Sequence, residues 1–252
     1  MAPKKDSSLL PKGMAIVLAQ EVGSDFEADL AGEAQVNVST SFFLAQELNN
    51  KNSISVSIAY TDQVNDPEVG AATNTALTWQ AHEMRILNDK AVLIQRVSTF
   101  LPTNLRDRED NSFQTAFSYA PRLIFSFKDN GTPLEWIFTP SIRRNVHEFS
   151  TNKDSRFNVE YTLGLSADAT YDYSDRIQFS LGGIYALNRT YNEINKEVFS
   201  LSQEMNILLS KQIIMGMGHR NGGSTLRADG SSNLGIYDKI NSEYFASLIY
   251  SM

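Results

Sequence analysis

Three histidines are the residues of this chain best suited to catalysis, and their neighbours decide whether they could perform it. A catalytic nucleophile must lie within hydrogen-bond reach of its base. His147 precedes Ser150 and Asn152, His219 precedes a glycine-rich stretch, and His82 has no serine close in sequence. None of these spacings forms a nucleophile–base pattern. We therefore expect no catalytic residues. We also expect no metal site, because three distant segments would have to converge to build one.

Composition excludes further chemistries. The chain has no cysteine, which removes disulfides, thiolate zinc sites and thiol catalysis. Its 22 basic and 29 acidic residues give a net charge of −7, whereas nucleic-acid affinity depends on concentrated lysine and arginine. We expect neither a cofactor nor a nucleic-acid partner.

Charged side chains of both signs remain as candidates, and they recur at alternate positions within apolar segments. Val159, Tyr161 and Leu163, for example, alternate with Glu160 and Thr162. Successive side chains of a β-strand point to opposite faces, so this spacing predicts strands with one apolar and one polar face. The alternation is found in residues 34–44, 53–61, 113–127 and 157–171, and less regularly in 134–142, 177–187, 199–209 and 244–252.

These segments are unusual for a soluble sheet. Several extend over 11 to 15 residues, whereas a typical strand has about 5–6 and a tilted membrane-spanning strand needs about 9–11. Their polar faces carry serine, threonine, asparagine, glutamine and glycine but few lysines. Such faces suit a wet barrel interior, and the apolar faces suit lipid. A soluble sandwich with an aromatic core is the alternative.

The connections alternate in length. Short polar turns are expected at 49–52, 88–89, 128–132, 172–175 and 210–211. Long stretches are expected at 23–32, 62–74, 102–111, 147–155, 189–197 and 219–242. Five short and six long connections join twelve strands and leave both termini on the short-turn side. The weakest segments are 13–22, 75–87 and 90–101; in 75–87 the apolar parity slips between Trp79 and Met84, as a bulge or a wrong assignment would make it do.

One domain accounts for nearly the whole chain. We expect residues 1–11 to form a flexible N-terminus and residues 12–252 a single barrel, with no internal repeat. Lys4 and Lys5 could begin a signal peptide, but no apolar core segment follows them. We therefore expect a signal peptide that has already been removed.

The chain resembles a Gram-negative outer-membrane β-barrel, porin-like and of the twelve-stranded size class. The last strand carries the most specific element, with Tyr244, Ala246, Leu248 and Tyr250 at alternate positions. Met252 replaces the aromatic residue that usually ends such barrels. The resemblance implies an all-β fold, a transmembrane antiparallel up-and-down β-barrel, in the bacterial outer membrane. It also implies contact with outer-membrane lipid and lipopolysaccharide, and recognition of the last strand by the barrel-assembly machinery.

If the apolar faces meet lipid, the opposite parity lines the lumen. The predicted pore-lining residues are Arg122, Glu135, Arg143, Glu160, Asp168 and Glu204. The same parity adds Asn145, Arg96, Glu83, Arg85 and Glu21. Charged rings select which ions enter a pore, so the leading hypothesis is a channel for passive diffusion of small hydrophilic solutes or ions. The long stretch 219–242 would be a mobile extracellular loop or would fold into the pore mouth.

Two other functions remain open. Paired charges could fill the lumen and make a closed structural or surface-interaction barrel, since twelve strands lie between the filled eight-stranded and the open sixteen-stranded barrels. Some twelve-stranded barrels are lipid hydrolases that use a histidine, a serine and an asparagine. The spacing around His147 differs from theirs.

Overall fold

We describe the protein from a computed structural model of residues 1–252. The structure describes residues 13–25, 36–49, 52–64, 66–81, 83–87, 91–129, 132–226, 232–235 and 242–252. The predicted flexible segment 1–11 and His82 lie outside these residues. Among them, no helix is long and apolar enough to cross a membrane.

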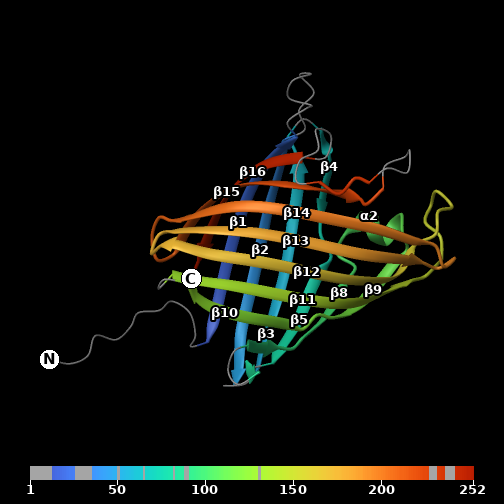
Figure 1. Ribbon diagram of the computed structural model, residues 1–252. Coiled ribbons are helices and arrows are strands. Elements are labelled where there is room, and N and C mark those ends of the chain that lie inside the picture. Colours follow the sequence, from blue (N-terminus) through green and yellow to red (C-terminus); the bar gives the residue numbers. More distant parts are fainter. Residues whose placement is uncertain are drawn as a thin grey trace.

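The described chain is almost entirely β-strand (Figure 1). Its first eight strands are β1 (Met14–Asp25), β2 (Val36–Asn49), β3 (Asn52–Gln63), β4 (Asp66–Ala72), β5 (Thr75–Ala81), β6 (Met84–Ile86), β7 (Ala91–Ile94) and β8 (Arg96–Leu101). A short helix, α2 (Leu105–Glu109), follows. The remaining strands are β9 (Phe113–Tyr119), β10 (Arg122–Asp129), β11 (Thr132–His147), β12 (Val159–Ser174), β13 (Ile177–Thr190), β14 (Asn195–Leu208), β15 (Ile213–Ser224) and β16 (Ser242–Ser251).

The strands form one closed antiparallel barrel. Strands β11 to β16 and β1 to β3 pair in chain order, and β1 pairs with both β2 and β16, which closes the sheet. Three barrel strands are interrupted: β4, β5 and β6 continue one another, as do β7 and β8, and β9 and β10. The barrel therefore has twelve strands, as the sequence predicts. Closure pairs the first strand with the last, so neither of them is left as a free edge strand that could pair with another chain.

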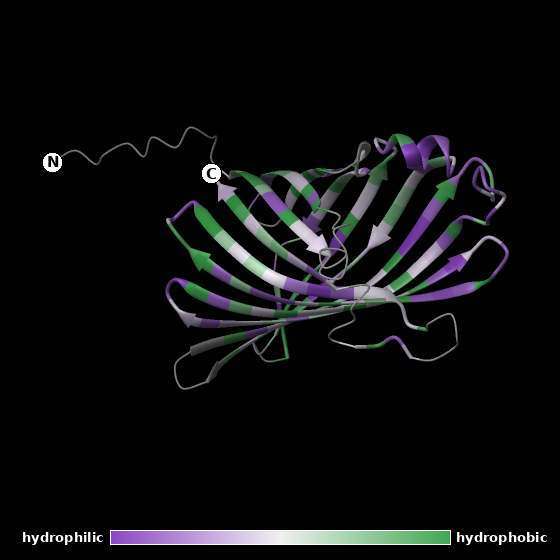
Figure 2. Ribbon diagram, turned by 90° about the horizontal axis from the view of Figure 1, so that it is seen from above, coloured by the Kyte–Doolittle hydropathy of each residue, from purple (hydrophilic) through white to green (hydrophobic). Residues whose placement is uncertain are grey.

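Hydropathy alternates along the strands, as Figure 2 shows by its coloured bands. Large apolar side chains of one parity are exposed to the outside, among them Leu163, Leu165 and Leu181. Residues of the opposite parity face the lumen, where Ser166, Ser180 and Ser202 are examples. We call these the outer and inner faces. The predicted division of each strand into an apolar and a polar face explains why a chain of average hydropathy folds as a barrel.

The parity slip in the fourth barrel strand is a bulge. Gln80 pairs with Arg96, and Met84 pairs with Leu93. Four residues on one strand thus span three on the other, which is a one-residue insertion. Because of the inserted residue, Met84 lies on the outer face together with Trp79, although an odd number of positions separates them. Both side chains are exposed. The bulge reading of the slip is therefore confirmed.

Two prolines explain the break between β9 and β10. Pro121 lies opposite Pro140 of β11, between the pairs Tyr119–Ile142 and Leu123–Phe138. Neither proline has a backbone N–H to donate to the ladder. The hydrogen-bond pattern is interrupted there without a change of register.

Three predicted long loops are shorter in the structure, so those boundaries are wrong. In the stretch 62–74, β4 pairs with the end of β3. In 189–197, β13 and β14 leave only four residues between them. In 219–242, β15 continues to Ser224. Their polar composition reflects strands that continue beyond the apolar belt, where both faces contact water.

The described part of the last loop lies against the outer face of β15. Asn221 is only 1% exposed, although its cross-strand partners Leu201 and Ser242 belong to the outer face. Its Nδ2 donates a hydrogen bond of 2.7 Å to the carbonyl of Gly235. Residues 232–235 therefore cover the outside of the barrel at this point, and the other residues between 227 and 241 lie outside the described part of the chain.

Both ends of the barrel chain meet at the short-turn end. Ile16 and Met252 exchange backbone hydrogen bonds of 3.1 and 2.9 Å, next to the turn between β2 and β3. Met252 takes the terminal position of the alternation and is 42% exposed. The predicted placement of the C-terminus agrees with the structure.

The two tryptophans give a direct test of the outer face. Trp79 and Trp136 are the only ones in the chain, and both lie on the outer face, 40% and 38% exposed. We expect brominated phospholipids to quench most of the tryptophan fluorescence of the reconstituted protein, because interfacial aromatic residues contact the acyl region. The soluble quencher iodide should quench it only weakly. The reverse pattern would show that this face meets water.

Candidate functional site

The lumen is the candidate site, and the strand registers show which of the predicted pore-lining residues share its inner face. The registers of β10, β11, β12 and β14 place five of the six predicted pore-lining residues on the inner face: Arg122, Glu135, Arg143, Asp168 and Glu204. Asn145, Arg96 and Glu21 share that face. Arg85, which pairs with Val92, shares that face by register, and Glu83 lies exposed beside the bulge of the fourth barrel strand. That these residues govern permeation stays a prediction.

Glu160 departs from the expected alternation. It lies in a register shift between Val159 and Tyr161, where it has no partner on β13. Its Oε1 is 3.8 Å from Nη2 of Arg144, whose strand neighbour Ile142 is 46% exposed on the outer face. The bulge thus removes Glu160 from the inner row, and the structure places its carboxylate away from the lumen.

An acidic cluster with one arginine lies on the wall formed by β1, β14, β15 and β16. Arg220 Nη2 is 2.7 Å from Glu21 Oε1, and its Nε is 2.6 Å from Glu243 Oε2. Glu204 lies close enough for its charge to act on that of Glu21. The Arg220 guanidinium also lies 5.1 Å from the centre of the Phe245 ring. Glu21, Glu204, Arg220 and Phe245 line a cavity of about 410 Å³.

The wall across the barrel from this cluster is rich in arginine. Arg96, Arg122 and Arg143 come from the fifth, sixth and seventh barrel strands, halfway round the closed sheet. Arg143 Nε donates to Asn145 Oδ1 at 2.8 Å, and its guanidinium stacks 4.1 Å from the centre of the Phe100 ring. The lumen therefore has an acidic side and a basic side.

At the long-loop end of the barrel, helix α2 places the carboxylate of Asp107 near the arginine-rich wall. Asp107 accepts hydrogen bonds from Asn74 Nδ2 at 2.7 Å and Asn111 Nδ2 at 3.1 Å. Its charge acts on Arg143 and on His147. The helix is held by its N-cap, where the Asp107 backbone N–H donates to Asn104 Oδ1. Sequence reasoning expected only a polar loop here.

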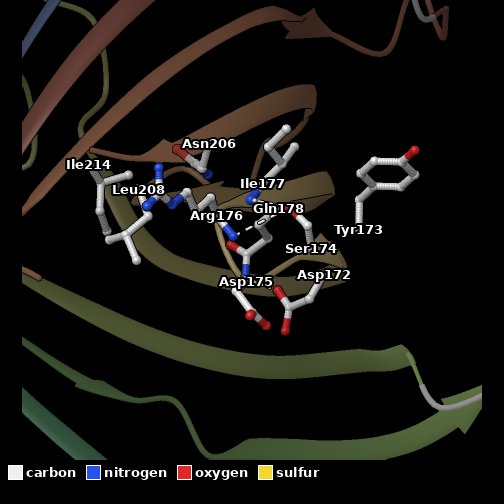
Figure 3. A pocket seen from close by; sticks show the side chains of 10 residues that line it. All are labelled: Asp172, Tyr173, Ser174, Asp175, Arg176, Ile177, Gln178, Asn206, Leu208 and Ile214. Atoms are coloured by element: carbon white, nitrogen blue, oxygen red, sulfur yellow. Dashed lines mark hydrogen bonds between the residues drawn. The ribbon is translucent and has the colours of Figure 1, made fainter. Parts of the chain in front are cut away.

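At the short-turn end, the turn between β12 and β13 borders a second cavity of about 470 Å³ (Figure 3). Gln178 Nε2 donates to Asp172 Oδ1 at 2.8 Å. Figure 3 shows Arg176 extending toward Asn206 and Leu208, while Tyr173 points away from the group. Charged groups of both signs thus stand at this mouth of the barrel.

The described histidines have aromatic neighbours. His147 lies between the rings of Phe113 and Tyr191, each 5.7 Å away, and its Nδ1 is 3.4 Å from the Tyr191 hydroxyl. His219 lies on the outer face, 5.0 Å from the ring of Tyr244. The alternation in residues 113–127 predicts Phe113 on the apolar, outer face. The bulge between Val146 and His147 turns it inward, where it is 4% exposed.

Comparison with known proteins identifies the fold. No family model and no curated protein matches the sequence. An outer-membrane channel from Pseudomonas putida F1 aligns over 100% of both chains with 11% identity and a TM-score of 0.59. The NanC porin aligns over 93% of this chain and 98% of its own, with 9% identity and a TM-score of 0.60. At these identities the likeness concerns the fold alone. The protein is a twelve-stranded β-barrel with the fold of porin-like outer-membrane channels.

Proposed function

We propose that the protein is an outer-membrane channel for passive diffusion of small hydrophilic solutes or ions, and not an enzyme. One observation carries this proposal: Ile184 is 51% exposed although it lies on the inner face, where it pairs with Ser166 and Ser200. A lumen filled by side chains would bury such a residue. The fold shared with known channels supports the same conclusion.

Permeation would depend on size and charge. Glycines on the inner face, such as Gly164, Gly182 and Gly216, have no side chain and therefore leave the lumen wider. The arginines on one wall and the acids on the opposite wall set the local electrostatic potential. Charges lining a narrow pore are screened less than those in bulk water, so they discriminate among ions.

The proposal includes a location and partners. The chain would lie in the bacterial outer membrane, with the outer face against lipid and the long loops near lipopolysaccharide. The barrel-assembly machinery would recognise β16, which carries the alternating terminal pattern.

Planar-bilayer recording of the purified, folded protein tests the channel. Discrete conductance steps are expected. Anomalous migration in SDS gels before heating shows that the barrel is folded. If such folded protein gives no conductance steps, the barrel is closed, and a structural or surface-interaction role becomes the better explanation of the fold.

A cysteine at Ile184 tests whether the lumen is open at that height. The chain contains no cysteine, so Ile184→Cys introduces a single thiol. We expect a cationic methanethiosulfonate reagent to lower the conductance of this variant stepwise, because the added group narrows the lumen and adds charge. Leu181→Cys is the matched control, since Leu181 is 56% exposed on the outer face of the same strand. Equal responses of the two variants would contradict the assignment.

A further inference from the structure

Arg96 and Arg122 are neighbouring cations that no described residue neutralises. Tyr119 pairs with Val97, and Ile94 pairs with Arg122, so the two arginines lie diagonally on adjacent strands of the inner face. Diagonal neighbours on one face of a sheet are roughly 7–8 Å apart. The charge of Arg122 acts on Arg96. Two like charges at this distance repel each other, and the repulsion is stronger away from bulk water.

Nothing in the described chain provides that compensation. Neither arginine forms an ion pair or a side-chain hydrogen bond with another described residue, and the Nε of each is buried without a partner. Glu135, on the same wall, lies 3.4 Å from Ser126 Oγ and forms no ion pair with Arg122. By contrast, Arg220 on the opposite wall binds two carboxylates. A buried N–H without an acceptor costs free energy, which favours a ligand that supplies one.

We propose that Arg96 and Arg122 form a binding subsite for an oxyanion group, a carboxylate or a phosphate, of a small solute in the lumen. The proposal rests on the channel function and names the solute class. A guanidinium presents a fixed fork of donors that matches two oxygens of such a group. Two forks on one wall can hold the same anion from two sides. The acids of the opposite wall would repel it toward the arginines.

Ion selectivity is the first test. In planar bilayers with a KCl gradient, Arg96→Gln and Arg122→Gln should each lower the chloride-to-potassium permeability ratio by about two- to fourfold, because one lumen charge is lost. Arg144→Gln is the matched control, since Arg144 is 60% exposed on the outer face. An unchanged ratio in channels that still conduct overturns the subsite. Absence of any conductance overturns the channel instead.

Binding is tested independently of conduction. Inorganic phosphate should raise the temperature at which the folded band is lost in SDS gels, compared with chloride at equal ionic strength, because a ligand of the folded state stabilises it. The Arg96→Gln/Arg122→Gln variant should lose this phosphate-specific rise, and Arg144→Gln should keep it. A rise equal in the double variant and the unmodified protein, or no rise in either, overturns the proposal.

Discussion

Replacement of Gly218 by valine is expected to abolish formation of the folded, heat-modifiable barrel. Gly218 lies on the inner face of β15, paired with Glu204 and Phe245. A Cβ at this position would lie 2.5 Å from the Gln203 carbonyl oxygen and 2.6 Å from the Phe245 ring. The carbonyl belongs to the ladder between β14 and β15, so it cannot move without breaking hydrogen bonds. Overpacking typically costs about 1–3 kcal/mol and occasionally more, and a clash with a backbone oxygen belongs at the upper end of this range.

Gly183→Val provides the matched control for Gly218→Val. The same side chain is added to a strand interior, but a Cβ at Gly183 has Leu201 Cδ2 as its nearest neighbour, at 3.4 Å. Valine favours strands, so the control should fold as well as the unmodified protein. The measurement is the fraction of folded band in SDS gels after refolding into detergent. Similar folding of both variants would show that β15 does not approach its neighbours this closely.

Gly218 also shows why part of the lumen was not predictable from the sequence. In β15, Gly216, Gly218 and Gly222 occupy the inner face, and Asn221 occupies the outer face. The glycines and the polar outer residue weaken the hydrophobic alternation that predicts a strand. The pattern therefore predicts a loop from residue 219 onward, and Arg220, which lies in the end of the strand, is not among the predicted pore-lining residues.

Where large apolar residues mark one face of a strand, the sequence is sufficient to predict the strand and the face on which each residue lies. The twelve strands, the bulge between Trp79 and Met84 and the inner position of Asp168 follow from parity. Parity fails at bulges near strand ends, where one inserted residue reverses the face. Glu160 and Phe113 changed faces for this reason. Contacts between distant segments, such as Asp107 with Asn74, leave no periodic signal.

Charge reversal at Arg220 is expected to destabilise the barrel at its closing seam. Arg220 of β15 holds Glu243 of β16 and Glu21 of β1, the strands that join the two ends of the chain. Arg220→Glu would place a fourth acid beside Glu21, Glu204 and Glu243. Removing one partner of a buried ion pair costs about 3–5 kcal/mol. The side chains of Arg220, Glu21 and Glu243 are 38%, 27% and 15% exposed, so solvent screening lowers the expected loss to about 2–4 kcal/mol.

Urea unfolding in phospholipid vesicles measures this loss, and a charge exchange tests its cause. Adding Glu243→Arg to Arg220→Glu should restore at least part of the stability, because positions 220 and 243 again carry opposite charges. Arg189→Glu is the control: Arg189 and Glu193 form a pair that is 50% and 76% exposed, and such pairs contribute about 1 kcal/mol or less. A cost for Arg220→Glu no larger than this control, or no recovery on exchange, would contradict an electrostatic seam.

The response to salt separates charge repulsion from loss of packing at the same seam. Added salt screens interactions between charges that contact water. In the unmodified protein it weakens the attraction of Arg220 for Glu21 and Glu243, so the seam's contribution to stability should fall. In Arg220→Glu it weakens repulsion among four acids, so stability should rise. Loss of the contact between Arg220 and the Phe245 ring, 5.1 Å from the guanidinium, would not change sign in this way. Opposite salt dependences of the two proteins are therefore expected if charge, and not packing, holds β1, β15 and β16 together.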